Sequence, residues 1–278
     1  MAYKSIFTVV TDHSNAAAAL AQAGEITAAQ DAHLEVMCLG VDRSQTSYYE
    51  VGVNAAILQA AIEQAHKKAE SIEEAVKADL RKTDLRWNSV VAVAAAPDAG
   101  QPAIRAARFA DLAVVPTPYG KNRGAEDVIV LEALLFNASC PTLIVPDGNK
   151  PSMPDNVVIG WNESAEALRA VRASMPFLKA AKAVHVAVID PPGHGPERSD
   201  PGGALAVMLA RHGVNCDIQV MSRGSMSIAE TLSKHATETA SQLLVMGGYG
   251  HSRFREAVLG GATRDMLENA KVPVLMAH

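Results

Sequence analysis

Short apolar runs alternate with longer stretches of helical periodicity along the first half of the chain. The runs predict strands, because they are rich in β-branched residues and end in polar or turn residues. Between them, apolar positions recur every three to four residues, as on one face of an amphipathic helix. Strands are expected at 6–10, 34–41, 89–94, 112–115 and 142–145, and helices at 15–30, 57–80, 103–109 and 128–137. This alternation implies right-handed crossovers and a mostly parallel sheet.

The same order of elements restarts after the segment 146–156, which contains three prolines and has no periodicity. Strands are expected at 157–161, 183–189, 216–221, 243–246 and 274–276. Helices are expected over 168–178, 205–209 and 228–236, and again before the last strand. We therefore predict an α/β protein of two tandem doubly wound domains, 1–148 and 155–278. Each would hold a five-stranded, mostly parallel sheet flanked by helices.

The two halves also match at particular positions, which tests a duplication better than element order does. Residues 12–14, Asp-His-Ser, correspond to residues 162–164, Asn-Glu-Ser, where the first strand of each half ends. Residues 137–141, Asn-Ala-Ser-Cys-Pro, correspond to 269–273, Asn-Ala-Lys-Val-Pro, before each last strand. A duplication explains both matches.

Composition excludes several classes of function. A net charge of −5 argues against a nucleic-acid partner, which requires a basic face to displace counterions from phosphates. No apolar run reaches the length of a membrane span, and the first residues do not form a secretory signal. The odd number of cysteines, three, predicts buried thiols in a reducing compartment. We therefore expect a cytoplasmic protein that does not act at a membrane.

A cluster of glycines follows the strand expected at 243–246. Gly247, Gly248 and Gly250 come first, and Gly260 and Gly261 open the last helix after nine intervening residues. Such glycines allow a close backbone approach, and amides at a helix start can bind an anion. The local chemistry is that of a phosphate cradle. The alternative is a tight strand exit with close helix-to-sheet packing, and neither a P-loop nor a complete dinucleotide fingerprint is present.

Together with residues 271–275, Lys-Val-Pro-Val-Leu, this spacing resembles the nucleotide-binding signature of ATP-binding universal stress proteins. The resemblance covers nearly the whole chain as a tandem pair and implies the fold of the adenine nucleotide α-hydrolase group. It implies that Gly247, Gly250 and Gly260 hold the phosphates and that the backbone of Val188 meets the adenine. An aspartate after the first strand holds the ribose in that family, and Asn162 occupies its place here.

The chain departs from the family pattern in both halves. Gly261 stands where the family has serine or threonine, so one hydroxyl contact is lost, and Thr263 is the nearest remaining hydroxyl. In the first half Asp12 and Val41 fit, but residues 116–119, Pro-Thr-Pro-Tyr, replace the glycine loop, and proline has no N–H to offer a phosphate. The second half is therefore the predicted nucleotide domain, with the first half its structural partner.

Asp12, His13 and Ser14 suggest a catalytic trio by residue type alone. Adjacent residues on one turn rarely converge on a substrate, and we expect Ser14 to cap the following helix instead.

The resemblance implies a stress-response protein that binds ATP or another adenine nucleotide, with Mg²⁺ as a companion of the phosphates. Since no general base or metal carboxylate accompanies the glycines, we expect no enzyme activity beyond slow ATP hydrolysis. The alternative is an interaction scaffold without nucleotide. An enzyme of the wider hydrolase group is disfavoured, because no Ser-Gly-Gly-x-Asp-Ser loop follows the first strand. The resemblance also implies protein partners, and pairing through 142–145 and 274–276 in a homodimer or within one chain.

Overall fold

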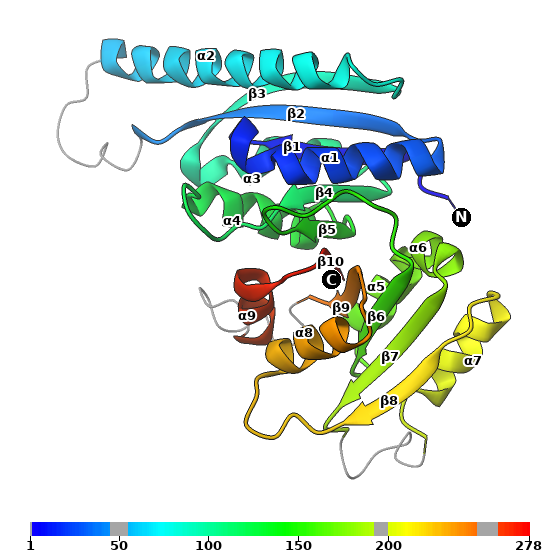
Figure 1. Ribbon diagram of the computed structural model, residues 1–278. Coiled ribbons are helices and arrows are strands. Elements are labelled where there is room, and N and C mark those ends of the chain that lie inside the picture. The colour runs from blue at the N-terminus through cyan, green and yellow to red at the C-terminus, as the bar shows by residue number, and fades with distance from the viewer. Residues whose placement is uncertain (1, 45–54, 192–199, 249–260) are drawn as a thin grey trace. The chain divides into compact units, whose positions relative to one another are not determined.

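The structure is a computed structural model that describes residues 2–44, 55–191, 200–248 and 261–278 (Figure 1). Contacts divide the chain into two compact units, Tyr3–Thr142 and Leu143–His278 with Met1–Ala2, here called the N-terminal and C-terminal units. Strand β5 (Thr142–Val145) lies at the division. The linker predicted between 148 and 155 is not tested by this division and stays a prediction.

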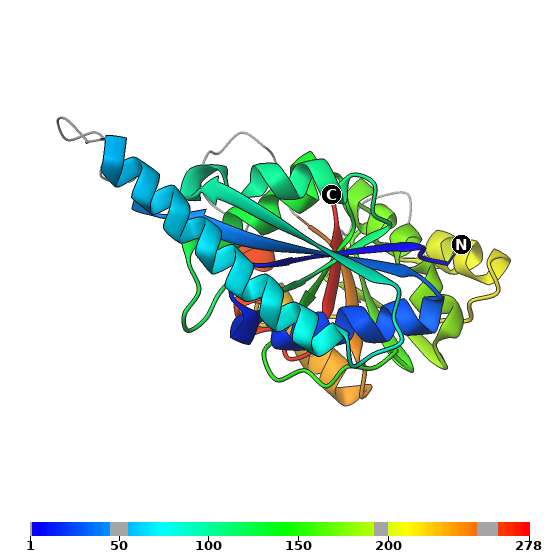
Figure 2. The same cartoon turned by 90° about the horizontal axis from the view of Figure 1, so that it is seen from above.

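The sheet of the N-terminal unit has the order β3-β2-β1-β4, and its pairings are parallel. Its strands are β1 (Ser5–Val10), β2 (His33–Asp42), β3 (Trp87–Ala95) and β4 (Leu112–Pro116). Its helices are α1 (His13–Gln30), α2 (Ala55–Leu80), α3 (Gly100–Ala107) and α4 (Ala125–Glu132), with a short 3₁₀ turn at Ala96–Asp98 and a π turn at Ala133–Asn137. Helix α1 packs on β1 and β4, and α2 lies along β2 and β3 (Figures 1 and 2).

Close packing of α2 on β2 depends on Gly40. A Cβ atom at this position would overlap the carbonyl oxygen of Ala65 and lie 3.1 Å from the Cβ of Ala69. Small residues on both elements therefore let the helix approach the strand. Larger side chains fill the remaining core, and Phe7, Leu34, Leu39, Ile72 and Leu112 are among those that are fully buried.

The C-terminal unit repeats this plan with the order β10-β9-β6-β7-β8, again paired in parallel. Its strands are β6 (Asn156–Trp161), β7 (Ala183–Ile189), β8 (Asp217–Met221), β9 (Leu243–Gly247) and β10 (Val274–Ala277). Its helices are α5 (Ala165–Ala173), α6 (Met175–Ala180), α7 (Gly203–Arg211), α8 (Ile228–Glu238) and α9 (Gly261–Asn269). The predicted α/β class, with a mostly parallel sheet flanked by helices, is confirmed.

Two local predictions are wrong. The single helix expected over 168–178 is two helices, α5 and α6, with a break at Ser174. Pro176 explains the break, because a proline nitrogen cannot donate to the carbonyl four residues earlier. The cap of α1 is Asp12 rather than Ser14, since the Asp12 carboxylate accepts from the amides of Ser14 and Asn15 at 3.0 and 3.2 Å.

Three titratable side chains meet beneath α8 in the C-terminal unit. The ring of His235, 4% exposed, stands edge-on to the ring of His185, with centroids 6.1 Å apart. The Nδ1 atom of His185 lies 2.7 Å from the Oδ1 atom of Asp217. Within the described ranges Nε2 of His235 is buried and has no hydrogen-bond partner. Burial, followed by the charge of His185, lowers the pKa of His235, and Glu238 and Asp217 oppose this change only in part.

We expect the stability of the C-terminal unit to fall as the pH drops through 6.5. The unfolded chain binds a proton at His235 near that pH, whereas the folded chain binds it only at lower pH, so acid favours unfolding. Urea unfolding at pH 7.5 and pH 5.5 measures the difference. The variant His235→Gln should lose part of the pH dependence, and His212→Gln, at an exposed histidine of the same unit, should keep it. Equal pH dependence in the two variants would contradict the assignment to His235.

Candidate functional site

Three strand ends of the C-terminal unit lie side by side at one edge of its sheet. The register pairs Trp161 of β6 with Val188 of β7, and Gly160 of β6 with Met246 of β9. Asn162, which follows β6, therefore lies between the end of β7 and Gly247 at the end of β9. The chain proceeds from β6 to β7 and β8 on one side and returns to β9 and β10 on the other. This edge is thus a topological switch point, where open α/β sheets bind ligands.

Asn162 is exposed, and one side of its amide is engaged locally. Its Oδ1 atom accepts from the amide of Ser164 at 3.2 Å, and the Ser164 hydroxyl in turn caps α5 by accepting from Ala167 at 3.1 Å. Glu163, between them, has the left-handed φ of 61° that this tight turn requires. The Nδ2 group of Asn162 has no hydrogen-bond partner among the residues that the structure describes. It remains a donor for a hydroxyl oxygen.

Val188 is placed at this edge but inside the ladder. It is 4% exposed and has strand partners on both sides, Trp161 and Val220. Strand β7 ends at Ile189, so backbone groups that could face a ligand begin there. The amide of Asp190, the next residue, already donates to the carbonyl of Met221 at 3.0 Å. The structure therefore places Val188 near Asn162, and the role of Val188 toward adenine stays a prediction.

Gly247 lies under the first turn of α5. A Cβ atom there would be 2.6 Å from the amide nitrogen of Ala167 and 2.9 Å from the carbonyl carbon of Glu166, closer than real Cβ contacts allow. Close helix-to-sheet packing, the alternative to phosphate binding in the sequence analysis, is therefore present at Gly247. The next residue, Gly248, donates its amide to Ala277 at 2.9 Å and accepts at its carbonyl from His278. The Gly248 amide is therefore not available to a phosphate.

The remaining phosphate positions lie at or before the start of α9. Gly250 and Gly260 fall outside the described residues. Gly261 opens α9 and is exposed, and a Cβ atom added there would meet no described residue within 4 Å. No described residue thus covers this helix start, where the first amides could meet an anion. Thr263 is 5% exposed in the same turn, so it is buried rather than presented beside Gly261.

The corresponding edge of the N-terminal unit is closed by charged side chains. Glu126, almost fully buried, accepts from Nε of Arg43 at 3.0 Å. Asp127 accepts from the hydroxyl of Thr11 at 2.8 Å and from the amide of Gly124 at 2.9 Å. Burial raises the pKa of Asp127. Two carboxyl groups thus occupy the first turn of α4, where a phosphate would need free amides.

Sequence reasoning missed this pair of acids, although a signal was present. Glu126 and Asp127 directly precede the apolar positions of the predicted helix 128–137, which is where acidic residues cap a helix. The trio suggested by residue type does not converge either. His13 is directed to Asp79 on α2, at 2.9 Å, while Asp12 caps α1.

Two further features concern the described part of the chain as a whole. No group of three or more histidine, cysteine, aspartate or glutamate side chains there is arranged to hold a metal ion. No helix within the same residues combines the length and apolarity that crossing a bilayer requires.

A family model for the universal stress protein family matches residues 153–278, which is nearly all of the C-terminal unit. Residues 153–278 therefore form a domain of this family. The universal stress protein Slr1230 from Synechocystis sp. is 26% identical over 92 residues, which are 33% of this chain and 31% of that protein. The match thus spans about a third of the curated relative, and that protein's activity is not transferred by it.

Two solved structures show that the fold extends over the whole chain. A universal stress protein from Archaeoglobus fulgidus DSM 4304 has a TM-score of 0.72 at 15% identity and covers 98% of this chain and 97% of its own. A putative universal stress protein from Pseudomonas aeruginosa UCBPP-PA14 has a TM-score of 0.60 at 15% identity, covering 98% and 92%. At this identity the likeness concerns the fold.

Gly247→Ala should destabilise the C-terminal unit by about 1–3 kcal/mol, because the added methyl group pushes the first turn of α5 off β9. Gly261→Ala is the matched control in the same unit, since its methyl group would meet no described residue within 4 Å. Urea unfolding without ligand measures both. Equal stabilities would show that the contact between α5 and Gly247 does not constrain the fold.

Proposed function

We propose that the chain is a stress-response protein that binds an adenine nucleotide, ATP or AMP, in its C-terminal unit. One observation supports this most strongly. Asn162, Val188 and Gly247 share the switch point of the unit that the family model matches, and no described residue covers Gly261 at the amino end of α9. The N-terminal unit places two carboxyl groups at its corresponding edge, which disfavours a polyphosphate there.

In this proposal the nucleotide lies across the switch point. The amides of Gly250, Gly260 and Gly261 hold the phosphates, and Mg²⁺ accompanies them. The free Nδ2 group of Asn162 donates to a ribose hydroxyl. Because Gly247 has no side chain, the phosphates can approach its backbone closely. Val188 lines the adenine side of the site, and the buried Thr263 supports the first turn of α9.

We infer binding rather than rapid turnover. Two carboxylates near this edge are engaged with arginines and are not free to take a proton: Asp190 pairs with Arg223 at 3.1 Å, and Glu166 lies 3.9 Å from Arg169. A general base would have to be free to take a proton. The nucleotide would then act by changing the conformation or the protein partners of a cytoplasmic protein, with at most slow hydrolysis. Pairing through last strands, between chains or within one, remains part of this proposal.

A scaffold without nucleotide is the second candidate. The packing role of Gly247 and the engaged amide of Gly248 favour it, because both explain early glycines of the motif without a ligand.

The two tryptophans allow binding to be assigned to a unit. Trp161 is buried at the end of β6 beside Asn162, and Trp87 begins β3 of the N-terminal unit. In Trp87→Phe, ATP or AMP should change the emission of Trp161 with a saturable dependence on concentration. In Trp161→Phe, the emission of Trp87 should stay constant. No saturable change in the first variant, together with no shift of the melting temperature by any adenine nucleotide, would favour the scaffold.

A substitution at Asn162 tests the ribose contact. Asn162→Ala should weaken nucleotide binding about fivefold, which corresponds to the loss of one hydrogen bond worth about 1 kcal/mol. Asn269→Ala makes the same change at the end of α9, where the amide bonds within its own helix, and should bind as the wild type does. Titration calorimetry with AMP measures both. Unchanged affinity in Asn162→Ala would remove this residue from the site.

A further inference from the structure

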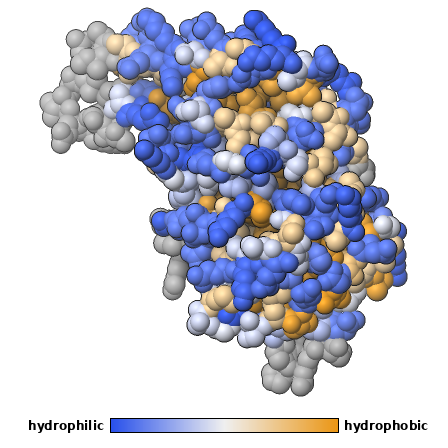
Figure 3. Space-filling view, viewed as in Figure 1, coloured by the Kyte–Doolittle hydropathy of each residue, from blue (hydrophilic) through white to orange (hydrophobic). Residues whose placement is uncertain are grey.

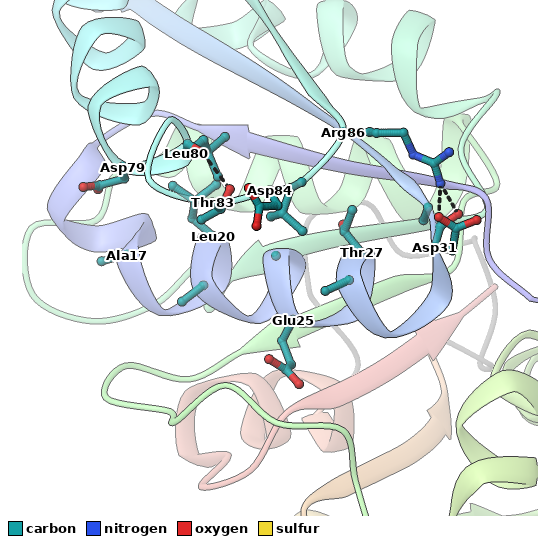
Figure 4. A pocket seen from close by; sticks show the side chains of 15 residues that line it. Ala17, Leu20, Glu25, Thr27, Asp31, Asp79, Leu80, Thr83, Asp84 and Arg86 are labelled. Carbon is teal, nitrogen blue, oxygen red and sulfur yellow. Dashed lines mark hydrogen bonds and ion pairs between the residues drawn. The ribbon is translucent and has the colours of Figure 1, made fainter.

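The N-terminal unit contains a cavity of about 710 Å³ at the end of its sheet opposite to Asp12 and α4. It lies between α1 and the segment 79–86, which connects α2 to β3 (Figure 4). Its lining includes Ala32 and Arg86, which directly precede β2 and β3. The cavity therefore lies at the amino ends of the strands, away from the carboxyl edge described above.

Small residues on α1 create the hollow. Ala17, Ala21, Gly24 and Ala28 line it, and their spacing places them on one face of the helix. A Cβ atom at Gly24 would already lie 3.3 Å from the Cδ1 atom of Leu85, so the wall across the groove is close. Leu20 and Leu80, both buried, add apolar surface. The volume falls in the range of small-molecule sites.

The charged residues of the lining leave an unbalanced negative charge. They are Glu25, Asp31, Asp79, Asp84 and Arg86. Arg86 pairs with Asp31 at one end of the groove (Figure 4). At the other end, Asp79 is held by His13 at 2.9 Å and Lys82 at 3.1 Å.

Asp84 lies between these two ends and lines the cavity together with Leu20 (Figure 4). Neither Asp84 nor Glu25 forms an ion pair with any residue in the described ranges. Asp84 thus offers a carboxylate beside apolar surface without a cation of its own.

We propose that this groove binds a small organic cation with an apolar body, an amine or guanidine that carries an alkyl or aryl group. The apolar body lies over the small residues of α1 and against Leu20 and Leu80, and the cationic head pairs with Asp84. The remaining carboxylates exclude an anionic analogue of the same shape. The site does not depend on nucleotide binding, which concerns an anion and the other unit.

Octylamine, octanoate and 1-octanol have the same eight-carbon chain and differ in the charge of the head group. Comparing them separates the contribution of the charge to binding from that of the apolar chain. Titration calorimetry of the full chain should show one saturable site for octylamine and none for octanoate, with 1-octanol weaker than octylamine. Raising the salt concentration should weaken the binding of octylamine, because its partner Asp84 is exposed to solvent. Equal binding of amine and carboxylate, or no saturable binding of the amine, would overturn the proposal.

Two pairs of variants locate the site. Asp84→Asn should weaken octylamine binding by up to about fivefold, the upper end of the range for an exposed ion pair, while Asp98→Asn, at an exposed aspartate outside the lining, should have no effect. Ala28→Trp should fill the groove and abolish binding, and Ala29→Trp, next to the lining on the same helix, should retain it. Melting curves without ligand report whether each variant folds. Octylamine binding that survives both Asp84→Asn and Ala28→Trp would refute the site.

Discussion

The first turn of α5 can lie directly on the end of β9 only while position 247 is glycine, because any Cβ atom there would strike the amide nitrogen of Ala167. That contact fixes the connection from β6 to α5, and Asn162 and Ser164 lie in this connection. The polar groups at the switch point are therefore positioned by a packing contact in the core. Packing and ligand binding make compatible demands on the same glycine, so its presence alone does not distinguish them.

The strands could be predicted from the sequence because they are short, β-branched and buried on both faces, as in β1 and β6. The residues at which helices begin and end were harder to predict from the sequence. Asp12 and Ser14 both carry good capping oxygens, and the choice depends on the extended backbone at Asp12, with φ −147° and ψ 126°. The apolar spacing from Leu168 to Leu178 continues through Pro176, so periodicity favoured one helix where the backbone forms two.

The candidate site was predictable to the extent that topology determines it. Parallel strands bring their carboxyl ends to one edge, so the positions of Asn162, Val188 and Gly247 follow from strand order and register. The residues that contact each of these positions in the folded chain cannot be predicted from the local sequence. The backbone of Ala167 meets Gly247 from a distant part of the chain, and Arg43 meets Glu126 across 83 residues. Such contacts depend on the assembled fold, and they decide whether an edge is open or closed.

The two units share one plan and differ in the charge they present. In the N-terminal unit, α2 has 26 residues and leads into the turn that closes the groove beside α1, whereas α7, its counterpart, has nine. The same unit fills its carboxyl edge with Glu126 and Asp127, and the amide of Gly124 before α4 already donates to Asp127. The C-terminal unit has the neutral Asn162 and the amino end of α9 at its edge, where a helix dipole favours an anion. The two proposed sites thus require ligands of opposite charge, an organic cation beside α1 and an anion at the start of α9, so one class of ligand does not suit both.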